Sequence, residues 1–284
     1  MTSLTLSDVA QSLPTNAETR VPRPGIRFVE FFGLPGIGKT TASSRLTDSL
    51  QRHGPPIGEV KAAREKGAFF GRQIDRIGIV GPRVLNRKFR SVLVRIARFV
   101  FESGQASVLD AIKVIWNISV LIAYMENERP KKNSIVVLEQ GLLQGFFSIL
   151  LKSKRRHTSE KWTDILTAIG IDDVVFVHLR GEVGLARDRL LTRSDRSSRM
   201  QRASHRSRAD LWSAADRACR EMAADLGMEM RAQEHAGVLA AVEVDRLSSP
   251  EDVAERALEA VLLACLDRQR LGGLADRRVC SDEL

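Results

Sequence analysis

The chain has 284 residues, 43% of them hydrophobic and 28% charged, and 44 Lys and Arg residues against 35 Asp and Glu give a net charge of +9. These proportions are close to the averages of globular proteins and exclude collagen-like, coiled-coil and wholly disordered chains. Arg supplies 34 of the cations. Because a guanidinium binds phosphate oxygens in bidentate fashion, this excess favours phosphorylated ligands, with biased genomic composition as the alternative.

The cysteines and the N-terminal residues bear on the cellular location. The three cysteines lie far apart without CxxC spacing, so they suggest neither a zinc site nor a disulfide framework, and we expect a cytoplasmic protein. Residues 1–25 contain no early positive charge and no apolar run, so we predict a flexible N-terminal tail rather than a secretory signal. The most apolar stretch, 108–125, is interrupted by polar residues and predicts a buried helix, so no membrane partner is expected.

The first predicted strand covers residues 26–32, a short aromatic and β-branched run that ends directly at a glycine. The next eight residues match the P-loop pattern GxxxxGK[ST], and helix-compatible residues continue from Thr41 to a stop at Gly54. The matching residues are Gly33, Leu34, Pro35, Gly36, Ile37, Gly38, Lys39 and Thr40.

The residue types of this pattern suit the binding of nucleotide phosphates. Glycines allow successive backbone N–H groups to converge on phosphate oxygens, and a helix that begins near Gly38 adds its positive N-terminal end. Lys39 would reach the β- and γ-phosphates, and the hydroxyl of Thr40 would bind Mg²⁺. We therefore predict that residues 33–41 bind ATP together with Mg²⁺.

Two weaker patterns follow. A short second strand is expected at 57–60, with Glu59 near its carboxyl end. Residues 82–128 contain two helical repeats of apolar residues and are expected to form a helical acceptor region. The first repeat is also rich in Arg and Lys, which predicts either acceptor-phosphate binding or a solvated helix face.

A central strand is predicted at 134–138, because this continuous apolar run is bounded by turn residues, as in a parallel strand with both faces covered. Glu139 follows directly. Ligands of open α/β sheets bind at the carboxyl ends of the strands, so Glu139 is a candidate to organise Mg²⁺ or accept a proton. A turn or helix-capping carboxylate is the alternative.

The last third of the chain predicts two more strands around an arginine-rich segment. A strand at 173–179 is followed by residues 180–208, which contain nine arginines and three acidic residues. Helical spacing would place Arg189 and Arg193 on one face, and we predict a lid over ATP, with a basic surface that binds RNA as the alternative. A final strand at 238–244 precedes a helix that begins at Ser249-Pro250, and residues 269–284 are expected to form a C-terminal tail.

This order of elements resembles the P-loop kinases of the nucleoside and nucleotide kinase type, with thymidylate kinases as the nearest named relatives, over residues 26–268. Residues 187–193 are similar to the arginine-bearing lid of such kinases. Leu138 to Gln144 stands where thymidylate kinases carry Asp-Arg-Tyr/His and deoxynucleoside kinases Glu-Arg-Ser, with Gln140 in the place of their arginine. No Arg-Glu-Pro-Gly stretch, which thymidylate kinases carry after their second strand, is identified, and Glu59 is the carboxylate expected in its place.

The resemblance implies one domain with the three-layer α/β/α P-loop NTPase fold and a mainly parallel sheet of about five strands. It also implies ATP- and Mg²⁺-dependent phosphoryl transfer to a small-molecule acceptor, in the first instance a nucleoside or nucleotide. Lys39, Arg189 and Arg193 would stabilise the transferred charge, and Thr40 and Glu139 would organise Mg²⁺ or the acceptor.

Two alternatives stay open: a kinase of a sugar or antibiotic hydroxyl, and a regulatory ATPase that docks on protein or nucleic acid through its basic surface. The kinase interpretation expects no nucleic-acid partner, and it leaves a homodimer open.

Overall fold

The computed structural model describes residues 25–53, 59–62, 69–130, 134–138, 140–155, 161–192, 199–202, 205–232 and 238–279. Within these ranges the strands form one five-stranded parallel sheet in the order β2-β3-β1-β4-β5, and β2 is a short edge strand that pairs only with β3. The predicted α/β class with a parallel sheet is confirmed. The strands are β1 (Phe28–Gly33), β2 (Glu59–Ala62), β3 (Ser134–Leu138), β4 (Val174–Gly181) and β5 (Val238–Val244).

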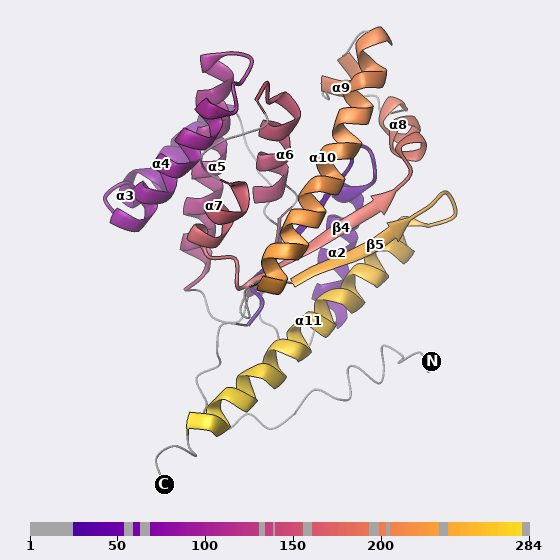
Figure 1. Cartoon of the computed structure of the whole chain (residues 1–284). Coiled ribbons are helices and arrows are strands. Elements are labelled where there is room, and N and C mark those ends of the chain that lie inside the picture. Colours follow the sequence, from indigo (N-terminus) through magenta and orange to yellow (C-terminus); the bar gives the residue numbers. More distant parts are fainter. Residues whose placement is uncertain are drawn as a thin grey trace.

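Helices cover both faces of this sheet (Figure 1). On one face α11 packs against α2, and on the other α6 packs on β1 and α10 packs on β5, while α4 and α5 lie beyond α6. The described helices are α2 (Lys39–His53), α3 (Phe69–Arg83), α4 (Arg87–Glu102), α5 (Val108–Glu128), α6 (Leu142–Lys152), α7 (Trp162–Ile169), α8 (Val183–Leu191), α9 (Arg199–Arg202), α10 (His205–Ala232) and α11 (Pro250–Val279).

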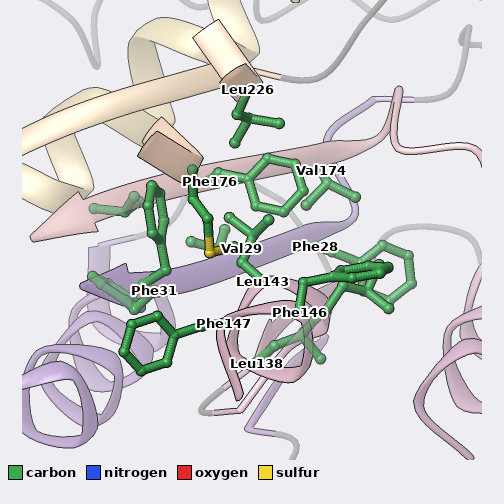
Figure 2. Close-up of a cluster of buried hydrophobic side chains, with 14 of the residues drawn as sticks. Phe28, Val29, Phe31, Leu138, Leu143, Phe146, Phe147, Val174, Phe176 and Leu226 are labelled. Atoms are coloured by element: carbon green, nitrogen blue, oxygen red, sulfur yellow. The ribbon is translucent and has the colours of Figure 1, made fainter. Parts of the chain in front are cut away.

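The core gathers around the central strands. All six residues of β1 are buried, and Figure 2 shows its aromatic side chains Phe28 and Phe31 close to Phe176 of β4 and to the phenylalanines of α6. A central parallel strand has both faces covered by helices and therefore carries apolar residues on both sides. This packing fixes β1, and with it the position of the glycines that follow.

Several boundaries differ from the sequence-based expectations. β2 begins at Glu59 and ends at Ala62, two residues later than predicted. The expected helical acceptor region contains α4, α5 and only the end of α3, which begins at Phe69. Residues 180–208 include the end of β4, all of α8 and α9, and the start of α10, and α11 continues past residue 268 to Val279.

One described helix, α5, is long and apolar enough to cross a membrane by length and composition alone. In the structure it packs against α3, α4 and α6. Only 33% of its most apolar window is buried, so the buried helix expected from the sequence is buried in part.

Candidate functional site

The sheet topology predicts where a ligand would bind. From β1 the chain goes to the edge strand β2 and back to β3 on one side, and then crosses to β4 and β5 on the other. A crevice forms at such a switch point, outside the carboxyl ends of the strands. The residues after β1, β4 and β5 meet at this edge: the glycine loop (residues 33–40), helix α8 and the loop 245–249.

The glycine loop has backbone φ angles that residues with a side chain rarely adopt. Gly33, Gly36 and Gly38 all have positive φ angles, of 143°, 89° and 112°. The side chain of Lys39 turns back over the loop, where its Nζ donates hydrogen bonds to the carbonyl oxygens of Gly33 (2.8 Å) and Leu34 (3.0 Å). The loop is thus a compact turn that holds a cation at the start of α2.

Gly36 also allows a close approach between the glycine loop and α8. A Cβ atom at this position would overlap the carbonyl oxygen of Ala186 and come within 2.9 Å of the Cβ of Leu190. Because both obstacles belong to a packed helix, neither can move aside cheaply. Helix α8 therefore lies directly on the glycine loop, and it brings Arg189 with it.

Arg189 connects the glycine loop with the loop after β5. Its Nη1 donates a hydrogen bond to the carbonyl oxygen of Ile37 (3.3 Å), and its Nη2 lies 3.5 Å from the carbonyl oxygen of Asp245. Beside this guanidinium is an open pocket of about 280 Å³, near the lower end of the size range of small-molecule sites. The pocket is lined by Gly36, Ile37, Gly38, Thr41, Ala42, Arg189, Ser248, Ser249, Pro250 and Val253.

The far wall of this pocket is the capped start of α11. The Ser249 Oγ accepts a hydrogen bond from the backbone N–H of Asp252 (3.1 Å), and the Asp252 carboxylate accepts one from the N–H of Ser249 (3.0 Å). This reciprocal pair satisfies two backbone donors and fixes where the helix begins. Hydrogen bonds from Ser249 hold the pKa of Asp252 below its usual range, so the cap is charged at neutral pH.

His178 of β4 lies near Lys39, in the core rather than in the pocket. Its ring stacks on Phe32, with 4.3 Å between the centroids and 12° between the planes. Burial, with smaller contributions from the charges of Arg180 and Lys39, lowers the pKa of His178 to about 4. It is therefore a neutral packing residue at physiological pH.

Glu30, a residue that the sequence analysis did not single out, is completely buried in the middle of β1. Its carboxyl group accepts hydrogen bonds from the backbone N–H groups of Leu142 (2.8 Å), Leu143 (2.7 Å) and Gln144 (3.3 Å) at the start of α6. Burial raises the pKa of Glu30 to about 8, and these hydrogen bonds oppose the shift. A Cβ atom at residue 141 would overlap this carboxyl group, so only Gly141 fits there.

The other sequence-predicted site residues divide into three groups. Thr40 and Thr41 are exposed in the first turn of α2, beside Lys39. Glu139 and Arg193 lie outside the described residues. The expectation for Glu59 is wrong, because Glu59 pairs with Ser134, the first residue of β3, and so lies at the amino edge of the sheet, away from the glycine loop.

The shifted bounds of β2 change which carboxylate follows the second strand. Because β2 ends at Ala62, Glu65 is the first acidic residue after its carboxyl end, in the sequence Arg64-Glu65-Lys66-Gly67. These four residues lie outside the described ranges. Because the second strand was predicted two residues too early, residues 64–67 were not recognised as the segment that follows it. The change from apolar to charged residues after Ala63 is the signal that indicates the true end of the strand.

The residues near the loop fit a phosphate-bound Mg²⁺ better than a metal held by protein alone. Among the described residues, no group of three His, Cys, Asp or Glu side chains could hold a metal ion. Mg²⁺ in phosphoryl-transfer sites commonly takes one or two protein ligands together with phosphate oxygens and water. The exposed Thr40 hydroxyl at the start of α2 suits that arrangement.

No family model matches the chain, and no curated protein is significantly similar to it.

Proposed function

We propose that the protein is a P-loop kinase that transfers a phosphoryl group from ATP, with Mg²⁺, to a small acceptor, in the first instance a nucleoside or nucleotide. The observation that carries this proposal is the glycine loop, with Lys39 folded over it, beside a pocket bounded by Arg189 and the start of α11. The N-terminus of a helix combined with converging backbone N–H groups binds phosphate.

Each residue has a role in this proposal. The glycine loop and the first turn of α2 bind the phosphates, and the pocket beside Arg189 receives the nucleoside part of ATP. Lys39 exchanges its two carbonyl partners for phosphate oxygens, where its charge stabilises the transferred group. Mg²⁺ would supply charge neutralisation to the phosphates when bound. Thr40 and Glu139 are its proposed protein ligands.

Arg189 and Arg193 are the proposed arginines of the lid. Arg189 lies in α8 and already contacts the glycine loop, so it would contact ATP without a large movement of its helix. On the acceptor side, Arg64-Glu65-Lys66-Gly67 stands after β2, where thymidylate kinases carry Arg-Glu-Pro-Gly. We therefore add Glu65 to Glu139 as a candidate acceptor-side acid and remove Glu59.

The decisive experiment is a screen of the purified chain with ATP and Mg²⁺ against pooled nucleosides, nucleotides, sugars and aminoglycosides, with ADP release as the readout. Lys39→Ala should lower the turnover of the active pool by about 10² to 10³, because it removes a preorganised cation from the transferred phosphoryl group. Arg52→Ala, at the exposed far end of α2, is the matched control and should keep the wild-type rate.

Two outcomes contradict the proposal. A folded Lys39→Ala protein with unchanged ATP turnover would exclude the phosphate site at the glycine loop. ATP hydrolysis that no acceptor stimulates, but that a protein or nucleic acid does, would favour the regulatory ATPase over the kinase.

A further inference from the structure

Exposed apolar side chains concentrate at one end of the α4–α5 helix pair. Phe101, at the end of α4, is 54% exposed, and at the start of α5 Val108 is 65%, Leu109 78% and Ile112 53% exposed. We call these four residues the α4–α5 tip. Contiguous exposed apolar residues of this kind mark an interaction surface, whereas single ones are ordinary.

The tip rests on a rigid base that includes the end of α6. The carbonyl oxygen of Ser103, between α4 and α5, accepts hydrogen bonds from the backbone N–H groups of Lys154 (3.0 Å) and Arg155 (3.2 Å). The side chain of Gln105 donates to the carbonyl oxygen of Ile149 in α6 (3.2 Å). Three chain segments are thereby tied together, so the apolar residues protrude from a fixed structure.

The charged residues around the tip, which we call its rim, are mostly cations. Its two carboxylates each have a cationic partner: Glu102 lies 3.5 Å from the Nε of Arg98, and Asp110 lies 3.5 Å from the Nζ of Lys152. Three further cations surround the turn and are exposed: Lys113, Lys154 and Arg155. Positive charge therefore exceeds negative charge around the apolar residues.

In place of the expectation that the chain has no membrane partner, we propose that the α4–α5 tip docks on an anionic lipid surface. Phe101, Leu109 and Ile112 would insert among the acyl chains, and the surrounding cations would lie at the headgroups. Apolar side chains flanked by Lys and Arg bind such surfaces because burial and charge attraction add together. A second copy of the chain fits poorly, because a two-fold contact would bring the same cations together. A nucleic acid offers the aliphatic side chains little to bury against.

This docking surface lies apart from the pocket proposed to bind ATP. The tip belongs to the helices beyond α6, whereas the pocket beside the glycine loop is bounded by α8 and α11 on the other side of β1 (Figure 1). Docking would therefore leave the pocket open to solvent. Substitutions at the tip should not change the affinity for ATP, because no tip residue lines that pocket, and this separates a failure of this proposal from a failure of the proposed function.

The test is co-sedimentation of the full chain with vesicles of phosphatidylcholine alone, or of phosphatidylcholine and phosphatidylserine in equal parts. The wild-type chain should bind only the phosphatidylserine vesicles at an ionic strength of about 0.15 M, where surface charge is partly screened. Leu109→Ser should weaken binding about tenfold, since it removes one inserted leucine. Leu247→Ser is the matched apolar control, because Leu247 is 93% exposed and lies in the loop after β5.

Two double variants test whether the position of the positive charge matters, as well as its amount. The double change Lys154→Gln with Arg155→Gln should weaken binding by about tenfold, whereas Arg217→Gln with Arg220→Gln on α10 should have little effect despite the same loss of net charge. Equal binding by Leu109→Ser and Leu247→Ser would overturn the proposal, because attraction by net charge alone would then explain sedimentation. So would a wild-type dimer that Leu109→Ser converts to a monomer without any binding to vesicles.

Discussion

Two helices begin at the same edge of the sheet, and their N-termini are used differently. Helix α2 follows β1 and has no acidic residue in its first turn, and its residues Thr41 and Ala42 line an open pocket. Helix α6 follows β3 and also lacks an acidic first turn, yet its backbone donors are filled by Glu30 from β1.

The comparison shows that two helix N-termini at one edge of a sheet can have different surroundings: α6 meets a buried carboxyl group, and α2 borders a pocket. Both ends present converging N–H groups and a positive dipole, so both attract anions. The buried carboxyl group of Glu30 satisfies the donors of α6 inside the protein. At the start of α2, the proposed function assigns the corresponding role to an external anion, the phosphate chain of ATP.

The largest expected effect comes from removing the Glu30 carboxyl group from the N-terminus of α6. Glu30→Ala should lower the free energy of unfolding by about 3 to 5 kcal/mol, because it leaves two buried N–H groups and one partly buried N–H group without an acceptor and creates a cavity. Chemical denaturation measures this. Glu251→Ala is the control, since Glu251 is exposed in its ion pair with Arg45, and should cost less than 1 kcal/mol. Similar losses in both variants would mean that Glu30 does not hold α6.

A second prediction concerns the protonation of Glu30. Its pKa rises from 4.5 to about 8 on folding, so the folded chain binds the proton more tightly than the unfolded chain. The contribution to stability is complete below pH 4.5 and is lost as the pH rises through 8, by a few kcal/mol in total. Denaturation across this range should show a decline in the wild type that Glu30→Gln, which resembles the protonated acid, lacks.

The difference between these two curves isolates Glu30 from His178. His178, with its pKa lowered to about 4, titrates in the opposite sense and destabilises the fold as the pH falls. Parallel curves for wild type and Glu30→Gln would indicate that the N–H groups of α6 keep Glu30 ionised, and that the α6 end is occupied by a full charge.

At the N-terminus of α2, the contact of Arg189 with ATP can be distinguished from a general effect of positive charge, because Arg187 on the same helix carries the same charge. Arg189→Ala should weaken ATP binding about tenfold, because the guanidinium lines the pocket and holds the carbonyl oxygen of Ile37. Arg187→Ala on the same helix is the control, since Arg187 is half exposed beside Asp188. Calorimetric titration with ATP tests both, and equal affinities would place the nucleotide elsewhere.

The smallest effect is expected where a helix caps itself locally. Ser249→Ala removes the acceptor for the backbone N–H of Asp252 and should cost about 1 kcal/mol of stability. The loss is small because water can reach this exposed end. Thermal unfolding measures it, with Ser248→Ala as a neighbouring comparison. A loss as large as that of Glu30→Ala would mean that the start of α11 is as dependent on its cap as α6 is on Glu30.

Sequence patterns worked best where the cause of the structure is local. The bounds of β3 and β5 agree with the predicted 134–138 and 238–244, because each is an apolar run closed by turn residues. The start of α11 at Pro250 follows from the Ser249-Pro250 cap signature. β2 was placed two residues too early, since four residues give little periodicity, and this error led to Glu59.

Glu30 escaped notice for a related reason. In the run Phe28 to Phe32 a single polar residue resembles an outward-facing position of an alternating strand, and the partner that justifies its burial lies 112 residues away. No local pattern in β1 refers to the start of α6. Helix α10 was missed likewise, because its arginine-rich beginning was assigned to the lid.

The sequence by itself therefore determined the parallel α/β class, the glycine loop with Lys39, and the neighbouring positions of Thr40 and Thr41, because hydrophobic period and turn chemistry act over a few residues. The tertiary structure decided which groups face one another across the chain. In the structure α8 packs on Gly36, and Glu30 accepts hydrogen bonds from the first N–H groups of α6. Glu59 lies at the amino edge of the sheet, and the α4–α5 tip is exposed. These outcomes depend on long-range packing and on the burial of charge, which no short stretch of sequence specifies.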